Sequence, residues 1–224
     1  MKKILLVVGG LAIAIATVPL FAAFEAHVIN VTAHIENALK VSPLSGEISF
    51  GTVFPQEYFI NKTISITTSS SFCQSTQRRV LNIDYRIVQK PKCINEVGEY
   101  APVNYWNDQC PDGYVEMPSL CPYLSKTPKH PDEPPYEDSG VLAFHNPEDP
   151  SSIATGTINK DHDLLDEWTI DLAVPCFEGY CSQDWDEFVR GINPDADPNA
   201  YILPYELESH TFGCDLWVEV TGIY

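Results

Sequence analysis

Basic residues are scarce in this chain of 224 residues, which has 13 Lys and Arg against 31 Asp and Glu. The formal net charge of −18 disfavours nucleic acid as a partner, because the phosphate backbone is recognised by positive charge. Beyond residue 24 the chain also lacks an apolar run of the roughly 20 residues that a membrane-spanning helix needs. We therefore expect no nucleic-acid partner, and contact with a membrane only through the N-terminal segment.

The sequence also lacks the short motifs that identify common hydrolases. None of its six histidines belongs to a His-Glu-x-x-His motif, and no Gly-x-Ser-x-Gly elbow is present. No Cys-x-x-Cys pair indicates a zinc site. His162 lies between Asp161 and Asp163, where a solvated turn histidine is favoured over a metal ligand. We expect no catalytic residue and no enzyme, and a secreted hydrolase is the least favoured function.

The first 22 residues have the layout of a secretory signal. Lys2 and Lys3 precede an apolar run at residues 4–16, and small residues follow where a signal peptidase would cut. We predict a signal peptide over residues 1–22 and a protein that is secreted, either extracellular or held at the cell surface. The mature chain then has 11 basic and 31 acidic residues, a net charge of −20.

The alternative for this segment is an uncleaved anchor. Residues 4–24 carry no charge, and roughly 20 apolar residues can span a bilayer. Gly9, Gly10 and Pro19, without a flanking charge that would stop transfer, favour cleavage instead.

All seven cysteines follow the signal, and in an exported chain we expect them to pair. Two short spacings predict local bridges, one from Cys110 to Cys121 and one from Cys176 to Cys181. Cys73, Cys93 and Cys214 allow one further pair and one leftover thiol, and the sequence does not say which of them pair.

Apolar and polar residues alternate through most of the mature chain, which is the period of half-buried β-strands. The long alternating segments are residues 29–35, 63–68, 81–87, 168–174 and 214–220, and shorter ones are residues 48–53, 141–144 and 153–158. Such a pattern predicts an all-β fold, an antiparallel β-sandwich that forms a single domain over residues 23–224.

Two regions interrupt the alternation. Residues 90–139 contain nine prolines, which we expect to exclude regular pairing and to form a long insertion loop. Residues 182–192 predict one short helix, with Ser182 as its cap and Gly191 as its stop. Its apolar face consists of Trp185, Phe188 and Val189.

A candidate calcium loop follows that helix. Asp195, Asp197, Asn199 and Glu206 supply oxygen at positions one, three, five and twelve of a calcium-binding loop. Ala200 replaces the glycine that the sharp turn of such a loop uses, and Asp and Asn beside proline are also ordinary turn formers. Weak calcium binding and a simple turn are both compatible with these residues.

The N-terminal third supports a family resemblance. It has an Ala-Phe-acidic start at Ala23-Phe24-Glu25, an apolar-Lys-Val ending at Leu39-Lys40-Val41, and a proline turn at Val53-Phe54-Pro55 before the strand at residues 63–68. This layout resembles the TasA and camelysin family of secreted prokaryotic proteins, over roughly residues 1–70. The resemblance implies a jelly-roll-like sandwich and a role as a subunit of biofilm matrix fibres.

The strand predicted over residues 23–41 begins at the cut site, and it can pair within its own sheet or fill the sheet of a neighbour. Its apolar face is formed by Ile29, Val31, Ala33 and Ile35. Donation of this strand predicts a head-to-tail homopolymer, because such contacts do not close on themselves.

A second hypothesis is a monomeric secreted adhesion or carbohydrate-binding sandwich that uses the insertion loop. Tyr105, Trp106, Tyr114 and Tyr123 would then offer aromatic rings to surface glycans. Packing of the same rings onto the sandwich is the alternative interpretation.

Overall fold

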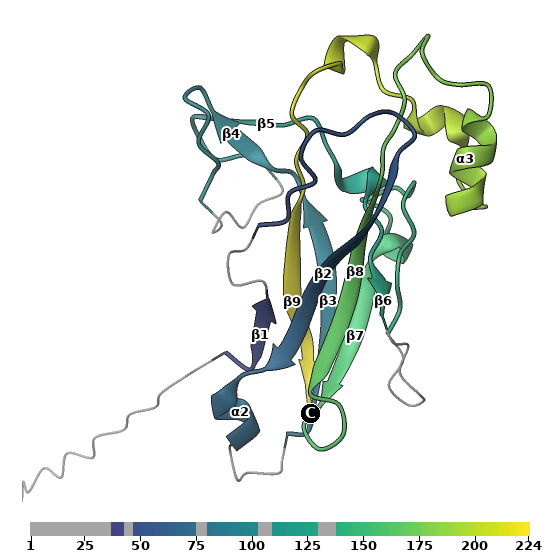
Figure 1. Cartoon of the computed structure of the whole chain (residues 1–224). Helices are drawn as coiled ribbons and strands as arrows, with labels where there is room; N and C mark the ends of the chain where they lie inside the picture. Colours follow the sequence, from purple (N-terminus) through teal and green to yellow (C-terminus); the bar gives the residue numbers. More distant parts are fainter. Residues whose placement is uncertain (1–36, 43–46, 75–79, 103–108, 130–137) are drawn as a thin grey trace, which may run out of the picture. The chain divides into compact units, whose positions relative to one another are not determined.

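The computed structural model describes residues 37–42, 47–74, 80–102, 109–129 and 138–224, although the side chains of residues 59–61 are not described (Figure 1). The strands are β1 (Leu39–Ser42), β2 (Tyr58–Thr68), β3 (Asn82–Lys90), β4 (Cys93–Asn95), β5 (Tyr114–Glu116), β6 (Thr127–Pro128), β7 (Ala154–Asn159), β8 (Leu165–Ala173) and β9 (Asp215–Ile223). The α-helices are α2 (Ser70–Gln74) and α3 (Trp185–Ile192), and the 3-10 turns are η1 (Cys121–Tyr123), η2 (Pro150–Ser152), η3 (Pro198–Tyr201) and η4 (Tyr205–Leu207).

The strands form an antiparallel sandwich, which confirms the predicted all-β class. One sheet has the order β1-β2-β8-β6 and the other has the order β7-β3-β9, while β4 and β5 form a separate pair. Every strand pair is antiparallel. The long predicted strands correspond to β2, β3, β8 and β9, whereas residues 29–35 lie outside the described residues.

The core lies between the two larger sheets and follows the predicted period of two. Its members from β2, β3 and β8 are each at most 5% exposed: Ile64, Ile66, Ile83, Tyr85, Ile87, Trp168, Ile170 and Leu172. Burying one aliphatic or aromatic side chain of this size contributes roughly 1.5–3 kcal/mol. The alternation therefore identifies the side chains whose burial holds the two sheets together.

A hydrogen-bonded chain crosses this core. The indole N–H of Trp168 donates to the Tyr85 hydroxyl at 2.8 Å, and that hydroxyl donates to Oδ2 of Asp166 at 2.5 Å. Burial, and then the nearby Asp166 charge, raise the pKa of Tyr85 well above its ordinary value. Gly156 leaves room for the Tyr85 hydroxyl, because a Cβ at that position would collide with it.

The prediction that prolines exclude regular pairing from residues 90–139 is wrong. Within this segment β4 pairs with β5, and β6 pairs with β8. The prolines Pro91, Pro111 and Pro118 stand outside the β4–β5 pair. Pro128 occupies β6, a two-residue strand at the sheet edge, where a missing N–H is tolerated.

Several shorter predictions need correction. Residues 153–158 correspond to β7, but residues 48–53 and 141–144 form no strand. Asp184 rather than Ser182 occupies the N-cap position of α3, without a side-chain capping hydrogen bond, and Gly191 lies inside the helix, which continues to Ile192. Trp185 and Val189 are buried on one face as predicted, with Phe188 packed against the same cluster.

The disulfides partly match the prediction. Cys176 bonds to Cys181 as expected, but Cys110 bonds to Cys93, and Cys121 bonds to Cys214. The predicted bridge from Cys110 to Cys121 is wrong because Ser119 pairs with Gly213, and this pairing places Cys121 beside Cys214. Cys73 is the free thiol and is exposed.

Candidate functional site

The two lateral sides of the sandwich differ. On the side of β6 and β7, residues 139–141 join the sheets: Ser139 pairs with Thr155 of β7, and Val141 pairs with Lys126 beside β6. Both contacts have two backbone hydrogen bonds, of 2.8 and 3.0 Å for Ser139 and of 2.7 and 2.8 Å for Val141. This side is therefore closed by main-chain pairing.

The opposite side lies between the edge strands β9 and β1 (Figure 1). In the described part of the chain β9 pairs only with β3, with Val220 opposite Tyr85 and Ile223 opposite Ile83. Directly paired residues share one face of a sheet, so Val220 and Ile223 face the core side. Yet Val220 is 44% exposed and Ile223 is 52% exposed, whereas Tyr85 and Ile83 are at most 1% exposed.

Strand β1 shows the same discrepancy on the other sheet. Val41 pairs with Ile66, which is fully buried, but Val41 itself is 36% exposed. β1 has only four residues, whereas its neighbour β2 has 11, so among the described residues β1 pairs only with residues 65–68 of β2 on that side. We call the side of the sandwich that carries Val41, Val220 and Ile223 the open side.

The open side combines two features that a β-strand can use. In the described part of the chain β9 is an edge strand, the position at which a further strand can pair, and its Val220 and Ile223 also point apolar side chains towards the core. Glu219, at an alternate position of β9, is turned to the outer face, where it bonds to Arg86 at 2.8 Å. An additional strand at this edge would gain hydrogen bonds and apolar contacts together.

The predicted assembly residues Ile29, Val31, Ala33 and Ile35 lie outside the described residues. The structure places only the end of that predicted strand, since Leu39 to Val41 belong to β1. Donation of the strand thus stays a prediction.

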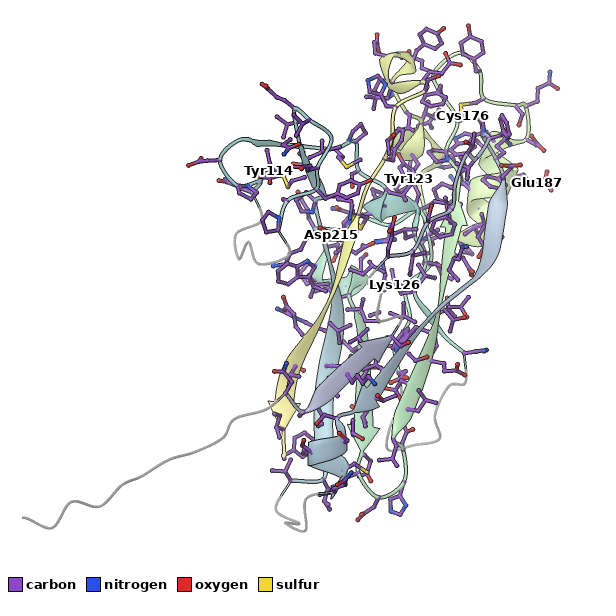
Figure 2. All side chains as sticks on the ribbon, turned by 60° about the vertical axis from the view of Figure 1, so that its left-hand side comes forward. Tyr114, Tyr123, Lys126, Cys176, Glu187 and Asp215 are labelled. Carbon is purple, nitrogen blue, oxygen red and sulfur yellow. A yellow bond between two sulfur atoms is a disulfide. The ribbon has the colours of Figure 1, made fainter. Side chains whose placement is uncertain are left out.

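The aromatic residues of the insertion do not form one surface. Tyr123 is only 6% exposed and packs edge-on against Phe144, with the two ring centroids 6.2 Å apart, so it belongs to the core (Figure 2). Burial raises its pKa above the ordinary range for tyrosine. Tyr114 lies on β5 and is partly buried, while Tyr105 and Trp106 lie outside the described residues. For Tyr123 the packing interpretation is the correct one.

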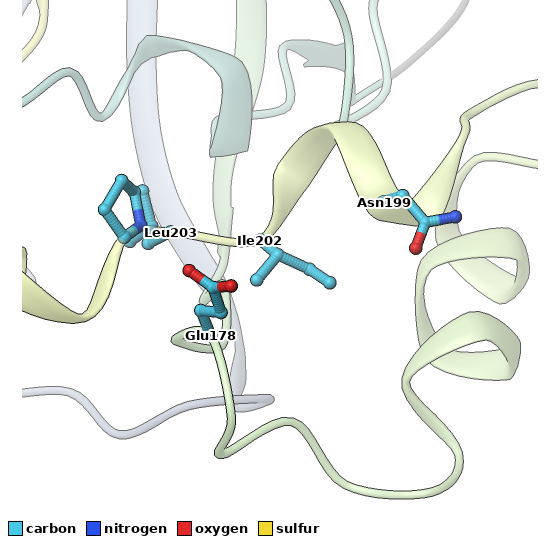
Figure 3. A pocket seen from close by; sticks show the side chains of 5 residues that line it. Glu178, Asn199, Ile202 and Leu203 are labelled. Carbon is cyan, nitrogen blue, oxygen red and sulfur yellow. The ribbon is translucent and has the colours of Figure 1, made fainter.

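The candidate calcium residues serve turns. The Asp197 carboxylate caps η3 by accepting from the Asn199 N–H at 3.1 Å, and Asn199 also donates its side-chain amide to Asp197 at 3.3 Å. Asn199 lines a shallow pocket with Glu178 (Figure 3). Asp195 and Glu206 are exposed, and no three His, Cys, Asp or Glu side chains among the described residues group as a metal site.

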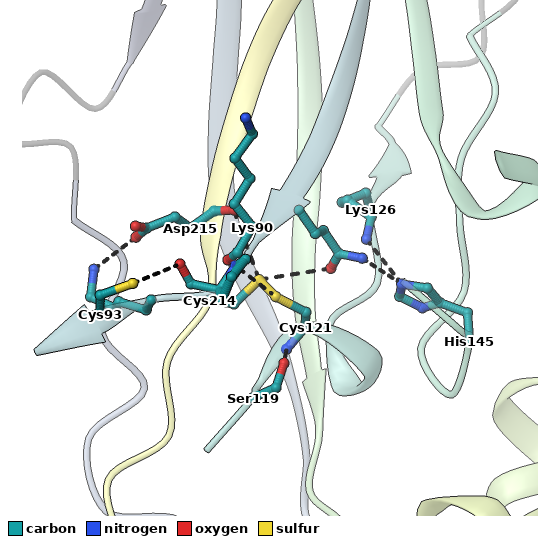
Figure 4. The surroundings of a disulfide bond; sticks show 11 residues. Lys90, Cys93, Ser119, Cys121, Lys126, His145, Cys214 and Asp215 are labelled. Atoms are coloured by element: carbon teal, nitrogen blue, oxygen red, sulfur yellow. Dashed lines mark hydrogen bonds and ion pairs between the residues drawn. A yellow bond between two sulfur atoms is a disulfide. The ribbon is translucent and has the colours of Figure 1, made fainter. Parts of the chain in front are cut away.

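A buried basic cluster was missed by the sequence analysis. Lys126 is fully buried, and its Nζ lies 3.5 Å from Nε2 of His145, which also bonds to Gln89 at 2.6 Å (Figure 4). His145 Nδ1 lies 2.8 Å from the carbonyl of Leu142, so we assign the imidazole proton to Nδ1 and leave Nε2 as an acceptor. Burial lowers the pKa of Lys126 to about 7, and burial together with the Lys126 charge lowers that of His145 to about 4.

His162 lies in the β7–β8 turn, where its backbone N–H donates to the side-chain oxygen of Asn159 at 3.1 Å.

None of the helices in the described part of the chain has the length and apolar character that crossing a membrane requires. The class of protein that these observations define is a disulfide-bonded antiparallel β-sandwich. Comparison of the chain with protein-family models, with curated proteins and with solved structures finds no match.

Proposed function

We propose that this protein is a secreted structural subunit that assembles into extracellular or cell-surface fibres. In this proposal the strand containing Ile29, Val31, Ala33 and Ile35 leaves its own subunit and fills the open side of the next one. The observation that carries the proposal is the exposure of Val220 and Ile223 beside their buried partners on β3. The contact is head-to-tail and does not close, so repetition generates a filament.

The energetics support such a contact. Each aliphatic side chain buried at the open side contributes roughly 1.5–3 kcal/mol before the cost of ordering the strand. Three or four of them, together with main-chain hydrogen bonds to an edge strand, suffice for a lasting association. Filling the edge also removes the hazard that an unpaired strand presents.

The three disulfides fit an oxidising, extracellular environment. The predicted signal peptide supports export, and its removal at Ala22 would leave the donated strand near the new N-terminus. The layout of residues 1–70 that resembles the TasA and camelysin family favours the same function. No calcium or other cofactor is needed for the contact.

Two single substitutions test donor and acceptor separately. Val31→Asp places a charge on the donated strand, and Val220→Asp places one on the open side, where the side chain is already 44% exposed. We expect each variant to fold and to remain monomeric in size-exclusion chromatography, because a buried unpaired charge opposes the contact. Val97→Asp, at a site 79% exposed beyond β4, is the matched control and should still form filaments.

Mixing the two variants sharpens the test. The Val220→Asp protein keeps an intact donor strand and the Val31→Asp protein keeps an intact open side, so the mixture should give dimers and no filaments. If wild-type protein stays monomeric at high concentration, or if Val31→Asp unfolds the isolated subunit, the strand belongs to its own sheet and the proposal is wrong.

A further inference from the structure

Two tyrosines stack on the surface where the Cys176–Cys181 loop meets η4. The ring centroids of Tyr180 and Tyr205 lie 5.3 Å apart with an interplanar angle of 22°. Tyr180 is 69% exposed and Tyr205 is 48% exposed. The pair therefore keeps a large aromatic surface in water, although burial of either ring would be favourable.

The segments that hold the two rings are fixed to each other. Phe177 and Leu203 form a parallel bridge, with hydrogen bonds of 2.9 Å from the Glu178 N–H to the Leu203 carbonyl and from the Leu203 N–H to the Cys176 carbonyl. The Cys176–Cys181 disulfide closes the loop, and Gly179 supplies the positive φ of 81° that its turn requires. A ligand that binds here meets a surface that is already ordered, which lowers the entropic cost of binding.

A pocket of about 270 Å³ lies on the same two segments (Figure 3). Ile202, Leu203 and Pro204 give it apolar walls, while Glu178 and Asn199 add a carboxylate and an amide. Pockets for drug-sized ligands occupy about 300–1,000 Å³, so this one suits a smaller unit. Glu178 precedes Tyr180 by two residues, and Pro204 precedes Tyr205 directly, so the same two segments carry the pocket and the stacked rings.

This combination indicates the class of ligand. A pyranose ring has C–H faces that pack on aromatic and aliphatic surfaces, and hydroxyl groups that donate to a carboxylate and accept from an amide. Residues 176–208 contain eight Asp and Glu but only one basic residue, Arg190, which disfavours acidic sugars. We propose that Tyr180, Tyr205, Glu178 and Asn199 form a binding site for one neutral sugar residue of a glycan.

The site is separate from the surface that assembles in the proposed function. Neither tyrosine belongs to β1 or β9, and the pocket residues lie in the loops after β8. A filament of these subunits would therefore display one sugar site per subunit. Many weak sites on one polymer bind a surface tightly, because the second and later contacts become intramolecular.

The experiment is a titration of isotope-labelled protein with methyl glycosides, followed by amide chemical shifts. The ligands are the methyl glycosides of glucose, mannose and galactose, with glucuronic acid and glucosamine as the charged comparisons. We expect at least one neutral glycoside to shift amides of residues 176–180 and 199–205 at millimolar concentration. Tyr180→Ser should weaken that binding about tenfold, equivalent to the loss of one aromatic contact.

Tyr100→Ser is the matched control, because Tyr100 is a tyrosine that is 51% exposed and is bridged to Ile94 of β4. It should leave the binding unchanged, and Tyr180→Ser should leave filament formation unchanged. The proposal is overturned if no neutral glycoside shifts these amides, if only a charged glycoside does so, or if Tyr100→Ser weakens binding as much as Tyr180→Ser.

Discussion

The closed and open sides of the sandwich are both bounded by edge strands, but they differ in whether another segment of the described chain pairs across them. On the closed side, residues 139–141 pair with both sheets, and the buried Lys126 lies in the segment that they cover. On the open side, β9 and β1 carry apolar residues that face the core and remain exposed. The apolar residues of the open side occupy the core-facing positions of the alternation, as the buried residues of β3 do. Their exposure therefore does not result from a sequence that is unsuited to a strand.

The largest expected effect concerns two residues that are paired across β3 and β9. Ile83 is fully buried, whereas its partner Ile223 is 52% exposed. We expect Ile83→Asp to lower the free energy of unfolding by about 4 kcal/mol or more, because a charge is buried without a partner. Ile223→Asp should cost less than about 1 kcal/mol in dilute, monomeric protein.

Chemical denaturation of both variants measures the difference. Equal losses would mean that the side chain of Ile223 is covered in the isolated subunit, and the open side would then not exist in solution.

The buried Lys126 gives the next largest effect, and its sign is set by pH. Its pKa is about 7 in the folded state against an ordinary 10.5, so between these values the unfolded chain binds more protons. The free energy of unfolding therefore rises with pH from about 7 to 10.5. We expect Lys126→Met to remove this dependence and to stabilise the protein below pH 7 by up to about 5 kcal/mol, at 1.36 kcal/mol per pKa unit.

His145 adds a separate window at lower pH. Its pKa is lowered from 6.5 to about 4, so stability also falls as the pH decreases through that range. Urea melts of wild type and Lys126→Met between pH 4 and pH 10 separate the two groups. A wild-type profile that is flat above pH 7 would contradict the assignment of Lys126.

The sequence predicted the core well and the closed side poorly, for physical reasons. Period-two alternation identifies Tyr85 and Trp168 as core residues. It also places Asp166 on the same face as Trp168, so the position of this buried carboxylate could have been predicted from the sequence. Burial of Lys126 could not be predicted, because lysine is almost never fully buried and its neighbours are not periodic. The Cys121–Cys214 bond joins positions 93 residues apart, and spacing alone favours closer partners.

Two of the disulfides can also be compared, because one closes a long segment of chain and the other closes a short one. Removing Cys121–Cys214, which closes 93 residues, should cost about 4–5 kcal/mol, whereas removing Cys176–Cys181, which closes five, should cost about 2 kcal/mol. Paired Cys→Ser variants with thermal melts measure both. If the short bridge were the more important for stability, strain or packing rather than chain entropy would determine its contribution.

The smallest expected effect concerns the outer face of β9. Arg86 bonds to Glu219 at 2.8 Å, with side chains that are 44% and 31% exposed, and Lys90 Nζ lies 3.9 Å from the same carboxylate. Exposed ion pairs are screened by water and contribute roughly 0.2–1 kcal/mol. A double-mutant cycle with Arg86→Met and Glu219→Gln should give a coupling energy within that range, and it should decrease when salt is added. A coupling above about 2 kcal/mol that salt leaves unchanged would show that the outer face of β9 is desolvated, and the contrast between its solvated outer face and its core-facing residues would no longer hold.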